Sequence, residues 1–486
     1  MHMFKGDNVL VSGGTFNINE PQSAINGTQS HMLMISLNLL ICSPLEVILK
    51  AFGENYVSSA THDNNDSLEA PKCHPGTRVS FLRRLSNWAM DSESPASVTW
   101  LHGPAGAGKS AIARSLAQIL DNDGLLAGSF FFFRTDSRRN SVNPFVATLA
   151  YQIAGFIPDT LQHIATAVEK DPTICSRSLE TQFKKLIADP ICASQTFVRK
   201  LIIIDGLDEC INPMAILKVF FDNLPRLQGH FKFLIISRPE YDIQGFFESA
   251  AASPGQRVDT IRLLGDLQAI EDVRVYLRDN FDRITRTHPL RAHFTSDWPS
   301  DDAIERLVEK SSGHFIYAST VIKYIENDRD RPQKRLDDIL KLRMSSQNPY
   351  AALDALYFDI LISSRADHSL LVNILSIVVQ DDRFPNQYSY EWRVMKSTQM
   401  LEAILVLEPG GCELELLDLK SLVEVKDTVN FWHKSFSDFL LDPFRSQEFH
   451  ASSAKACTLI AKYCLRWLSS NLSEQRFRTT YINDFS

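Results

Sequence analysis

The stretch LHGPAGAGKSAIARSLAQIL, Leu101–Leu120, decides the fold of this chain of 486 residues. It fits the pattern G-x-x-x-x-G-K-[ST] at every fixed position over Gly103–Ser110. The apolar run Ser97–Leu101 before it predicts a short buried strand. Ile112 and Leu116 after it keep helical spacing, so the pattern has a strand before it and a helix after it.

The glycine-rich loop is suited to hold phosphate. Its glycines let backbone N–H groups turn inward around an anion, and the following helix adds its N-terminal dipole. Lys109 supplies a positive charge to the β- and γ-phosphates, and Ser110 offers a hydroxyl to Mg²⁺. The predicted cradle consists of Gly103, Pro104, Ala105, Gly106, Ala107, Gly108, Lys109 and Ser110.

A second segment, LIIIDGLDEC, supplies acidic groups after a buried strand. Leu201–Ile204 form the predicted strand, and Asp205 at its carboxyl end can hold Mg²⁺ through water. Asp208 and Glu209 follow on the loop, and one of them could polarise an attacking water. The alternative is an acidic turn after a strand, which the complete glycine loop earlier in the chain disfavours.

A third segment, FLIISRPE, places a cation at the same edge of the sheet. Phe233–Ile236 predict a strand, and Arg238 leaves its end on the same side as Asp205. A cation at this position could sense the γ-phosphate of a nucleotide. In isolation a surface arginine before a proline would be the better interpretation. With the other two segments, the sensor is favoured.

The predicted fold is an α/β P-loop NTPase domain followed by helical and winged-helix domains. Apolar strands without alternation, separated by helices, indicate a parallel sheet covered by helices. Short strand-like pieces among later helices indicate the winged helix, at Ile404–Val406, Leu422–Val425 and Val429–Trp432. The predicted boundaries are 1–64 for a short N-terminal region, 65–265 for the nucleotide-binding domain, 266–350 for the helical domain, 351–450 for the winged helix and 451–486 for a C-terminal helical segment.

The N-terminal region carries three weaker predictions. Val11–Asn19 could form a short hairpin within a partly disordered region, and the polar stretch 56–72 a linker. Met32–Cys42 predicts a buried helix or strand, with a membrane-surface segment as the alternative. Met32–Cys42 is too short to span a bilayer, which takes about 20 residues. It also lacks the basic lead-in of a signal peptide.

Charge and cysteine usage limit the class of protein. The net charge of −8 argues against nucleic acid as the main partner, because such binding depends on clustered Lys and Arg. The eight cysteines have no C-x-x-C spacing. Without a secretory signal, they predict reduced thiols in a cytoplasmic protein that has no transmembrane segment.

The three segments together resemble a NACHT domain of the STAND class of signal-transducing P-loop NTPases. The flanking sequences resemble the fungal NOD-like receptor type more closely, over about residues 65–470. These flanks are APKCHPGTR (Ala70–Arg78), SSGHFIYAST (Ser311–Thr320), LDALYFDIL (Leu353–Leu361) and FWHKSFSDFLLDPFRS (Phe431–Ser446).

The resemblance implies ATP or ADP with Mg²⁺ as ligands and assigns a role to each matching position. Thr77 and Arg78 would lie near the adenine, and His433 would reach from the winged helix to the β-phosphate. A core histidine is the alternative for His433. The remaining implied roles are Mg²⁺ for Ser110 and Asp205, water activation for Asp208 and Glu209, and sensing for Arg238.

The expected function is a nucleotide-operated switch in innate immunity or cell-death signalling of the fungal type. ADP would hold the chain closed, ATP would free a surface for self-association, and slow hydrolysis would reset the switch. Two alternatives stay open: a truncated NACHT scaffold that binds nucleotide without switching, and a constitutive P-loop ATPase. The chain departs from related switches in lacking G-x-P before the winged helix, where Gly313-His314-Phe315 stands, and in containing no repeat sensor.

Overall fold

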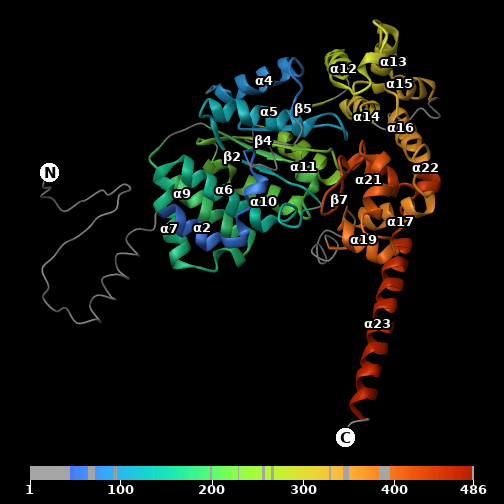
Figure 1. Cartoon of the computed structure of the whole chain (residues 1–486). Helices are drawn as coiled ribbons and strands as arrows, with labels where there is room; N and C mark the ends of the chain where they lie inside the picture. Colours follow the sequence, from blue (N-terminus) through green and yellow to red (C-terminus); the bar gives the residue numbers. More distant parts are fainter. Residues whose placement is uncertain are drawn as a thin grey trace, which may run out of the picture.

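In the computed structural model, five parallel strands form a central sheet in the order β2-β3-β4-β1-β5 (Figure 1). Their bounds are β1 Val98–His102, β2 Leu126–Phe131, β3 Lys200–Asp205, β4 Phe231–Ser237 and β5 Val258–Arg262. The structure describes residues 44–63 and 72–483, apart from 92, 95, 135, 197–199, 228, 254–257, 264–266, 328–329, 343–349 and 383–393. Because β4 lies between β1 and β3, the segment after β4 emerges between the segments that follow the other two strands.

The sheet is apolar on both faces, as the continuous apolar strands predict. In β3, Leu201 and Ile203 belong to one hydrophobic core, whereas Ile202 and Ile204 belong to the core on the opposite face. Successive side chains of a strand point to opposite faces, so a strand buried on both sides needs apolar residues throughout. The predicted α/β class is therefore confirmed.

Helices cover both faces of the sheet (Figure 1). Two helices pack on one face and share a core with the strand residues Leu101 and Ile203: α4 (Val79–Met90) and α5 (Lys109–Asn122). The other face is covered by helices that share a core with Trp100 and Phe233: α6 (Val142–Phe156), α10 (Pro213–Leu227) and α11 (Tyr241–Ala252). The carboxyl ends of β1, β3 and β4 lie at one edge of the sheet, where His102, Asp205 and Ser237 are buried.

Residues 44–63 pack on the α/β domain, so the predicted linker is wrong for residues 56–63. Helix α2 (Pro44–Phe52) buries Phe52 in the core of the sheet. The Val57 N–H donates to Thr148 Oγ1 at 3.1 Å, and the His62 N–H donates to Ser129 Oγ at 3.1 Å. These bonds fix a polar stretch that has no periodicity of its own. Residues 64–71 and the segments predicted at Val11–Asn19 and Met32–Cys42 lie outside the described residues.

The C-terminal half contains a helical region and then a winged helix. The first comprises α12 (Leu267–Thr287), α13 (Asp301–Ser311), α14 (Phe315–Ile325) and α15 (Pro332–Lys341). The second comprises α16 (Ala351–Ile362), α17 (His368–Val378), α19 (Thr398–Leu405), the antiparallel hairpin of β6 (Val423–Val425) and β7 (Val429–Phe431), and α21 (Lys434–Leu441). One hydrophobic core runs through both regions. Helices followed by a two-stranded hairpin are the expected arrangement of a winged helix.

The strand predicted at Ile404–Val406 is wrong, because these residues end helix α19. The Ser397 hydroxyl accepts a hydrogen bond from the Met400 N–H and caps the start of this helix. Val406 follows its last residue with φ +60°, which stops the helix. Leu401 and Ile404 are buried at helical spacing, so the apolar run serves a helix.

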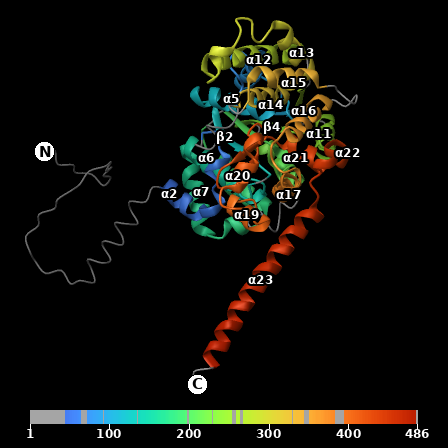
Figure 2. The same ribbon diagram turned by 45° about the vertical axis from the view of Figure 1, so that its right-hand side comes forward.

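The long helix α23 (Ser453–Asn483) closes the described chain and projects from the body of the molecule (Figure 2). Its first turns pack on the winged helix through Ala456, Leu459 and Ile460. The Arg466 Nη2 atom donates to the Ile404 carbonyl oxygen at 2.6 Å. Within the described part of the chain, no helix combines the length and apolar content needed to cross a membrane.

Candidate nucleotide site

The predicted phosphate loop lies between β1 and α5, and Lys109 is the first residue of α5. Gly106 has φ +74° and Gly108 has φ +87°, both in the left-handed region that glycine adopts without a steric penalty. A Cβ atom on Gly106 would also collide with the Ile316 side chain of α14. The glycines therefore permit both the turn of the loop and its close contact with the helical region.

Lys109 is held against the loop that it follows. Its Nζ atom donates to the carbonyl oxygens of Gly103 and Pro104, each at 2.8 Å. Burial lowers the pKa of Lys109 to about 8, although the nearby Asp208 carboxylate acts in the opposite direction. An anion bound in the loop would favour the charged ammonium and raise this pKa again.

Asp205 ends β3 and offers a buried oxygen atom suited to a cation. The residue is 3% exposed, and its Oδ1 atom has no hydrogen-bond partner among the described residues. Burial raises the pKa of Asp205, while Arg114 and a hydrogen bond from Ser110 lower it. A buried carboxylate oxygen without a donor is costly, and a hard cation satisfies it. Asp205 and Ser110 therefore fit Mg²⁺.

Asp208 and Glu209 occupy the 3-10 turn Leu207–Glu209 and have different neighbours. Asp208 Oδ1 accepts the Arg238 backbone N–H at 2.9 Å, and its Oδ2 lies 3.4 Å from Arg238 Nε. Glu209 Oε2 accepts the Arg134 backbone N–H at 3.0 Å. Burial, and then the Asp208 charge, raise the pKa of Glu209 to about 7. Asp208 thus orients Arg238, and Glu209 has the pKa of a general base near neutral pH.

Arg238 follows β4 and links the α/β domain to the winged helix. Its Nη1 atom donates to Asp438 Oδ2 on α21 at 2.7 Å. The guanidinium group therefore lies between the carboxylates of Asp208 and Asp438, one from each domain. This position agrees with the prediction that Arg238 lies at the same sheet edge as Asp205.

His433 lies at the N-terminus of α21 and its ring is neutral. Its Nδ1 atom accepts the Ser435 backbone N–H at 3.0 Å, so the proton of the neutral ring is on Nε2. Burial, followed by the charges of Arg238 and Lys109, lowers the pKa of His433 to about 3. The ring is thus a partly buried N–H donor close to the cations of the phosphate site. It is also a helix cap, so the structural role considered for this residue is present as well.

Thr77 and Arg78 lie at the opposite edge of the loop. The Thr77 hydroxyl donates to the His74 carbonyl oxygen at 2.7 Å. Arg78 donates from Nη2 to the Ala107 carbonyl oxygen and from its backbone N–H to Asp272 Oδ2, each at 3.1 Å. Arg78 therefore joins the phosphate loop to helix α12.

Three charged residues of the site escaped sequence analysis. Arg134 lies just beyond the carboxyl end of β2, and its Nη2 atom donates to the Asp208 carbonyl oxygen at 2.8 Å. Lys434 opposes the rise in the Glu209 pKa, and Asp438 binds Arg238. Two features of the sequence could have indicated these residues. Arg134 is a cation close to the end of a predicted strand, and Lys434 and Asp438 have the four-residue spacing of one helix face.

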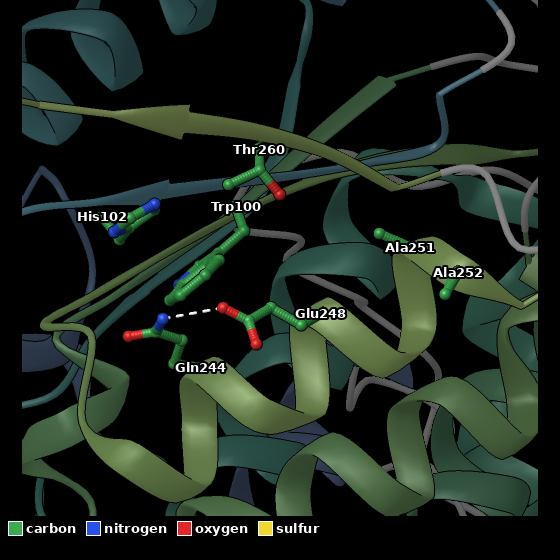
Figure 3. A pocket seen from close by; sticks show the side chains of 7 residues that line it. All are labelled: Trp100, His102, Gln244, Glu248, Ala251, Ala252 and Thr260. Carbon is green, nitrogen blue, oxygen red and sulfur yellow. Dashed lines mark hydrogen bonds between the residues drawn. The ribbon is translucent and has the colours of Figure 1, made fainter.

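A separate pocket of about 500 Å³ lies between α11 and strands β1 and β5 (Figure 3). Gln244 and Glu248 of α11 line it and are hydrogen-bonded to each other at 2.7 Å. Trp100 forms its floor, stacked between His102 at 4.0 Å and Phe247 at 4.5 Å between ring centroids. Its lining includes none of the predicted site residues.

Comparisons with known proteins match the nucleotide-binding region. Residues 76–238 match the family described as Nephrocystin 3, N-terminal, and this range contains the phosphate loop, Asp205 and Arg238. A comparison with curated proteins finds no match. The loop, the strand order and the family match together define a P-loop NTPase fold.

Solved structures show distant similarity to 76–85% of this chain. A STAND protein with a tetratricopeptide repeat sensor from Pyrococcus horikoshii is 15% identical, with a TM-score of 0.43, over 85% of this chain and 52% of that one. The chain thus spans about half the length of that protein. A Walker-type ATPase of Pyrococcus abyssi is 14% identical, with a TM-score of 0.36, over 76% and 98%. The Aeropyrum pernix ORC1 protein, solved in complex with DNA, is 14% identical, with a TM-score of 0.36, over 81% and 96%. Similarities this distant assign no residue role.

Proposed function

We propose that this chain is a switch of the STAND class, operated by ADP and ATP with Mg²⁺. One observation carries the proposal: α21 of the winged helix closes on the phosphate site, where Asp438 binds the sensor Arg238 at 2.7 Å. A nucleotide in the loop would therefore contact two domains at once. A ligand that favours one arrangement of two domains shifts the equilibrium between them.

The strand-end residues would bind and polarise the nucleotide. The N–H groups of Gly103–Ser110 and the Lys109 ammonium would hold the phosphates. Ser110 and Asp205 would hold Mg²⁺, which neutralises phosphate charge when bound. Glu209 would take a proton from the attacking water. Thr77 and Arg78 would lie on the side of the adenine.

The winged-helix side would read the bound diphosphate through His433. Because Nδ1 is occupied by the α21 backbone, the Nε2–H group is the remaining donor of the neutral ring. A bond from this donor to the β-phosphate would stabilise the closed arrangement of the domains. Departure of the winged helix would break that bond and expose the surfaces that it covers.

Hydrolysis would be slow and would serve to reset the switch. In the closed chain Arg238 is already bound by Asp438, so it is not available to stabilise charge on a γ-phosphate. The ATP-bound chain would self-associate in the cytoplasm, in immune or cell-death signalling of the fungal type that the sequence resembles. The trigger and the downstream effector are unassigned.

Thermal unfolding with Mg·ADP and Mg·ATP tests nucleotide binding. A ligand at 100 times its dissociation constant stabilises the native state by about 2.7 kcal/mol. Lys109→Ala is expected to abolish most of that shift. Lys200→Ala is the matched control, because Lys200 also donates to a backbone carbonyl, that of Gly124 at 2.7 Å, but at the opposite end of the strands. An equal shift in wild type and Lys109→Ala would overturn the assignment.

Light scattering and phosphate release on the same sample then separate the three functions. A switch is expected to change its mass between ADP and a non-hydrolysable ATP analogue. A constitutive ATPase would turn over steadily at constant mass. A scaffold would bind nucleotide with neither response.

A further inference from the structure

Helix α21 presents a pair of opposite charges to the phosphate site. Lys434 and Asp438 are four residues apart, so they project from the same helix face. Asp438 binds Arg238, whereas burial and then the positive charges of Arg238 and Arg134 lower the pKa of Lys434, against a smaller opposite effect of Glu209 and Asp208. The ion pair of Asp438 with Arg238 is therefore a direct charged contact between α21 and the α/β domain at this site.

The Arg238 guanidinium is engaged by two carboxylates in this arrangement. It lies 3.4 Å from Asp208 Oδ2 through Nε and 2.7 Å from Asp438 Oδ2 through Nη1. Asp208 is 3% exposed on its side chain and belongs to the same domain, so it accompanies Arg238 in any movement of the winged helix. Asp438 belongs to the other domain and is removed when the domains separate.

The Asp438 carboxylate binds Arg238 where a γ-phosphate would bind it. An aspartate carboxylate and a terminal phosphate both bind a guanidinium through charged oxygens. A γ-phosphate directed at Arg238 would compete with Asp438 for the same N–H groups. It would also bring negative charge close to the Asp438 carboxylate, which is unfavourable. ADP has no γ-phosphate, so it neither competes with Asp438 for Arg238 nor places negative charge beside the Asp438 carboxylate.

We propose that Asp438 determines the preference of the closed chain for ADP over ATP, by binding Arg238 in place of the γ-phosphate. This inference rests on the proposed nucleotide site. ATP gains Arg238 only when Asp438 leaves, so the choice of nucleotide and the movement of α21 are the same event. Lys434 departs with Asp438, because both residues belong to α21.

The test compares nucleotide affinities of the full chain carrying Asp438→Asn. Dissociation constants for Mg·ADP and for the Mg²⁺ complex of a non-hydrolysable ATP analogue are measured by titration with fluorescent nucleotides. The amide keeps the size of the side chain and removes its charge. We expect the ATP-analogue affinity to rise about tenfold relative to that for ADP, while the ADP affinity changes less than about threefold.

Two further variants show whether the charge is the cause. Asp438→Glu keeps the carboxylate and is expected to restore the ADP preference to within about threefold of wild type. Asp354→Asn is the matched control, because Asp354 accepts hydrogen bonds from Arg445 at 2.7 and 3.0 Å within the winged helix, away from Arg238. It is expected to leave the preference unchanged. Asp438→Ser replaces Asp438→Asn if the amide does not fold.

The outcomes distinguish the inference from the function on which it rests. An unchanged ratio in folded Asp438→Asn or Asp438→Ser, or an equal loss for both nucleotides, overturns the role of Asp438 and leaves the nucleotide site standing. A wild-type chain that binds neither nucleotide overturns both.

Discussion

The two sides of the candidate nucleotide site are held in different ways. On the strand-end side, the loop and the acids are fixed by the parallel sheet and by backbone hydrogen bonds, such as that from Arg134 N–H to Glu209. On the winged-helix side, α21 contacts the strand-end side through charged side chains. The direct contact is the ion pair of Asp438 with Arg238. Buried backbone geometry is rigid, whereas ion pairs at a partly exposed interface are replaceable by another ligand. We therefore expect the strand-end side, here called the fixed wall, to keep its geometry. We expect the winged-helix side, here called the removable wall, to separate when a ligand replaces its ion pair.

The strongest test of the fixed wall is Glu209→Gln. We expect ATP hydrolysis to fall at least about 100-fold, because general-base catalysis contributes that much or more. ATP binding is expected to persist, since the carboxylate is needed for water and not for phosphate contact. Single-turnover phosphate release measures the rate. The companion Asp208→Asn is expected to weaken the orientation of Arg238, and hence ATP binding, more than it slows the chemical step. If Glu209→Gln cleaves at the wild-type rate, Glu209 is only part of a polar turn.

Gly106→Ala tests whether the loop depends on its contact with α14. The new Cβ would collide with Ile316 and be strained at φ +74°. We expect a loss of roughly 2–3 kcal/mol in the free energy of unfolding. Gly124→Ala is the control, because Gly124 has φ +63° and a Cβ atom there would meet no heavy atom within 4 Å. It is expected to cost about 1 kcal/mol. Equal losses in urea unfolding would show that only backbone strain matters.

His433 variants test the removable wall. His433→Ala removes both the cap on Ser435 and the Nε2–H donor, whereas His433→Asn keeps a capping oxygen and withdraws the donor, because the amide N–H groups of asparagine lie closer to the backbone than Nε2. A hydrogen bond to a charged group contributes roughly 1.5–3 kcal/mol, so both variants are expected to lose about tenfold or more in ADP affinity. ADP release in stopped flow is expected to accelerate in both. Only the alanine variant is expected to melt lower without nucleotide. Unchanged ADP release in His433→Asn would assign this residue to structure alone.

The smallest expected effect is a dependence of stability on pH. The folded chain lowers the pKa of His433 from 6.5 to about 3, so its stabilisation is complete above pH 6.5 and is lost as the pH falls from there towards 3. Between about pH 7.5 and 5.5 this loss is about 1.4 kcal/mol. Glu209 acts in the opposite direction, because its raised pKa stabilises the fold as the pH falls below about 7. Its contribution cancels in the difference between wild type and His433→Asn, measured by urea unfolding at both pH values. A difference that does not change with pH contradicts a His433 ring that is neutral in the folded chain.

The residues of the fixed wall can be predicted from the sequence, whereas the contacts of the removable wall cannot. Gly103–Ser110 are contiguous, and Asp205 and Arg238 each follow a run of buried apolar residues, so local pattern reveals them. The pairing of Arg238 with Asp438 joins residues that are far apart in the chain, and no local pattern encodes which face of α21 meets the sheet. The strand predicted at Ile404–Val406 failed for a related reason. A short apolar run serves a helix or a strand equally well, and the Ser397 cap selected the helix.

Helix α23 gives the movement of the winged helix a mechanical consequence. Its first turns are fixed to α17 and α19, while the helix continues for 31 residues in all, which corresponds to about 46 Å. A rotation of the winged helix by roughly 10° would displace the far end by about 8 Å, since displacement grows with the length of a rigid helix. The exchange of one carboxylate for one phosphate at Arg238 would thereby produce a displacement of several ångströms at the far end of α23.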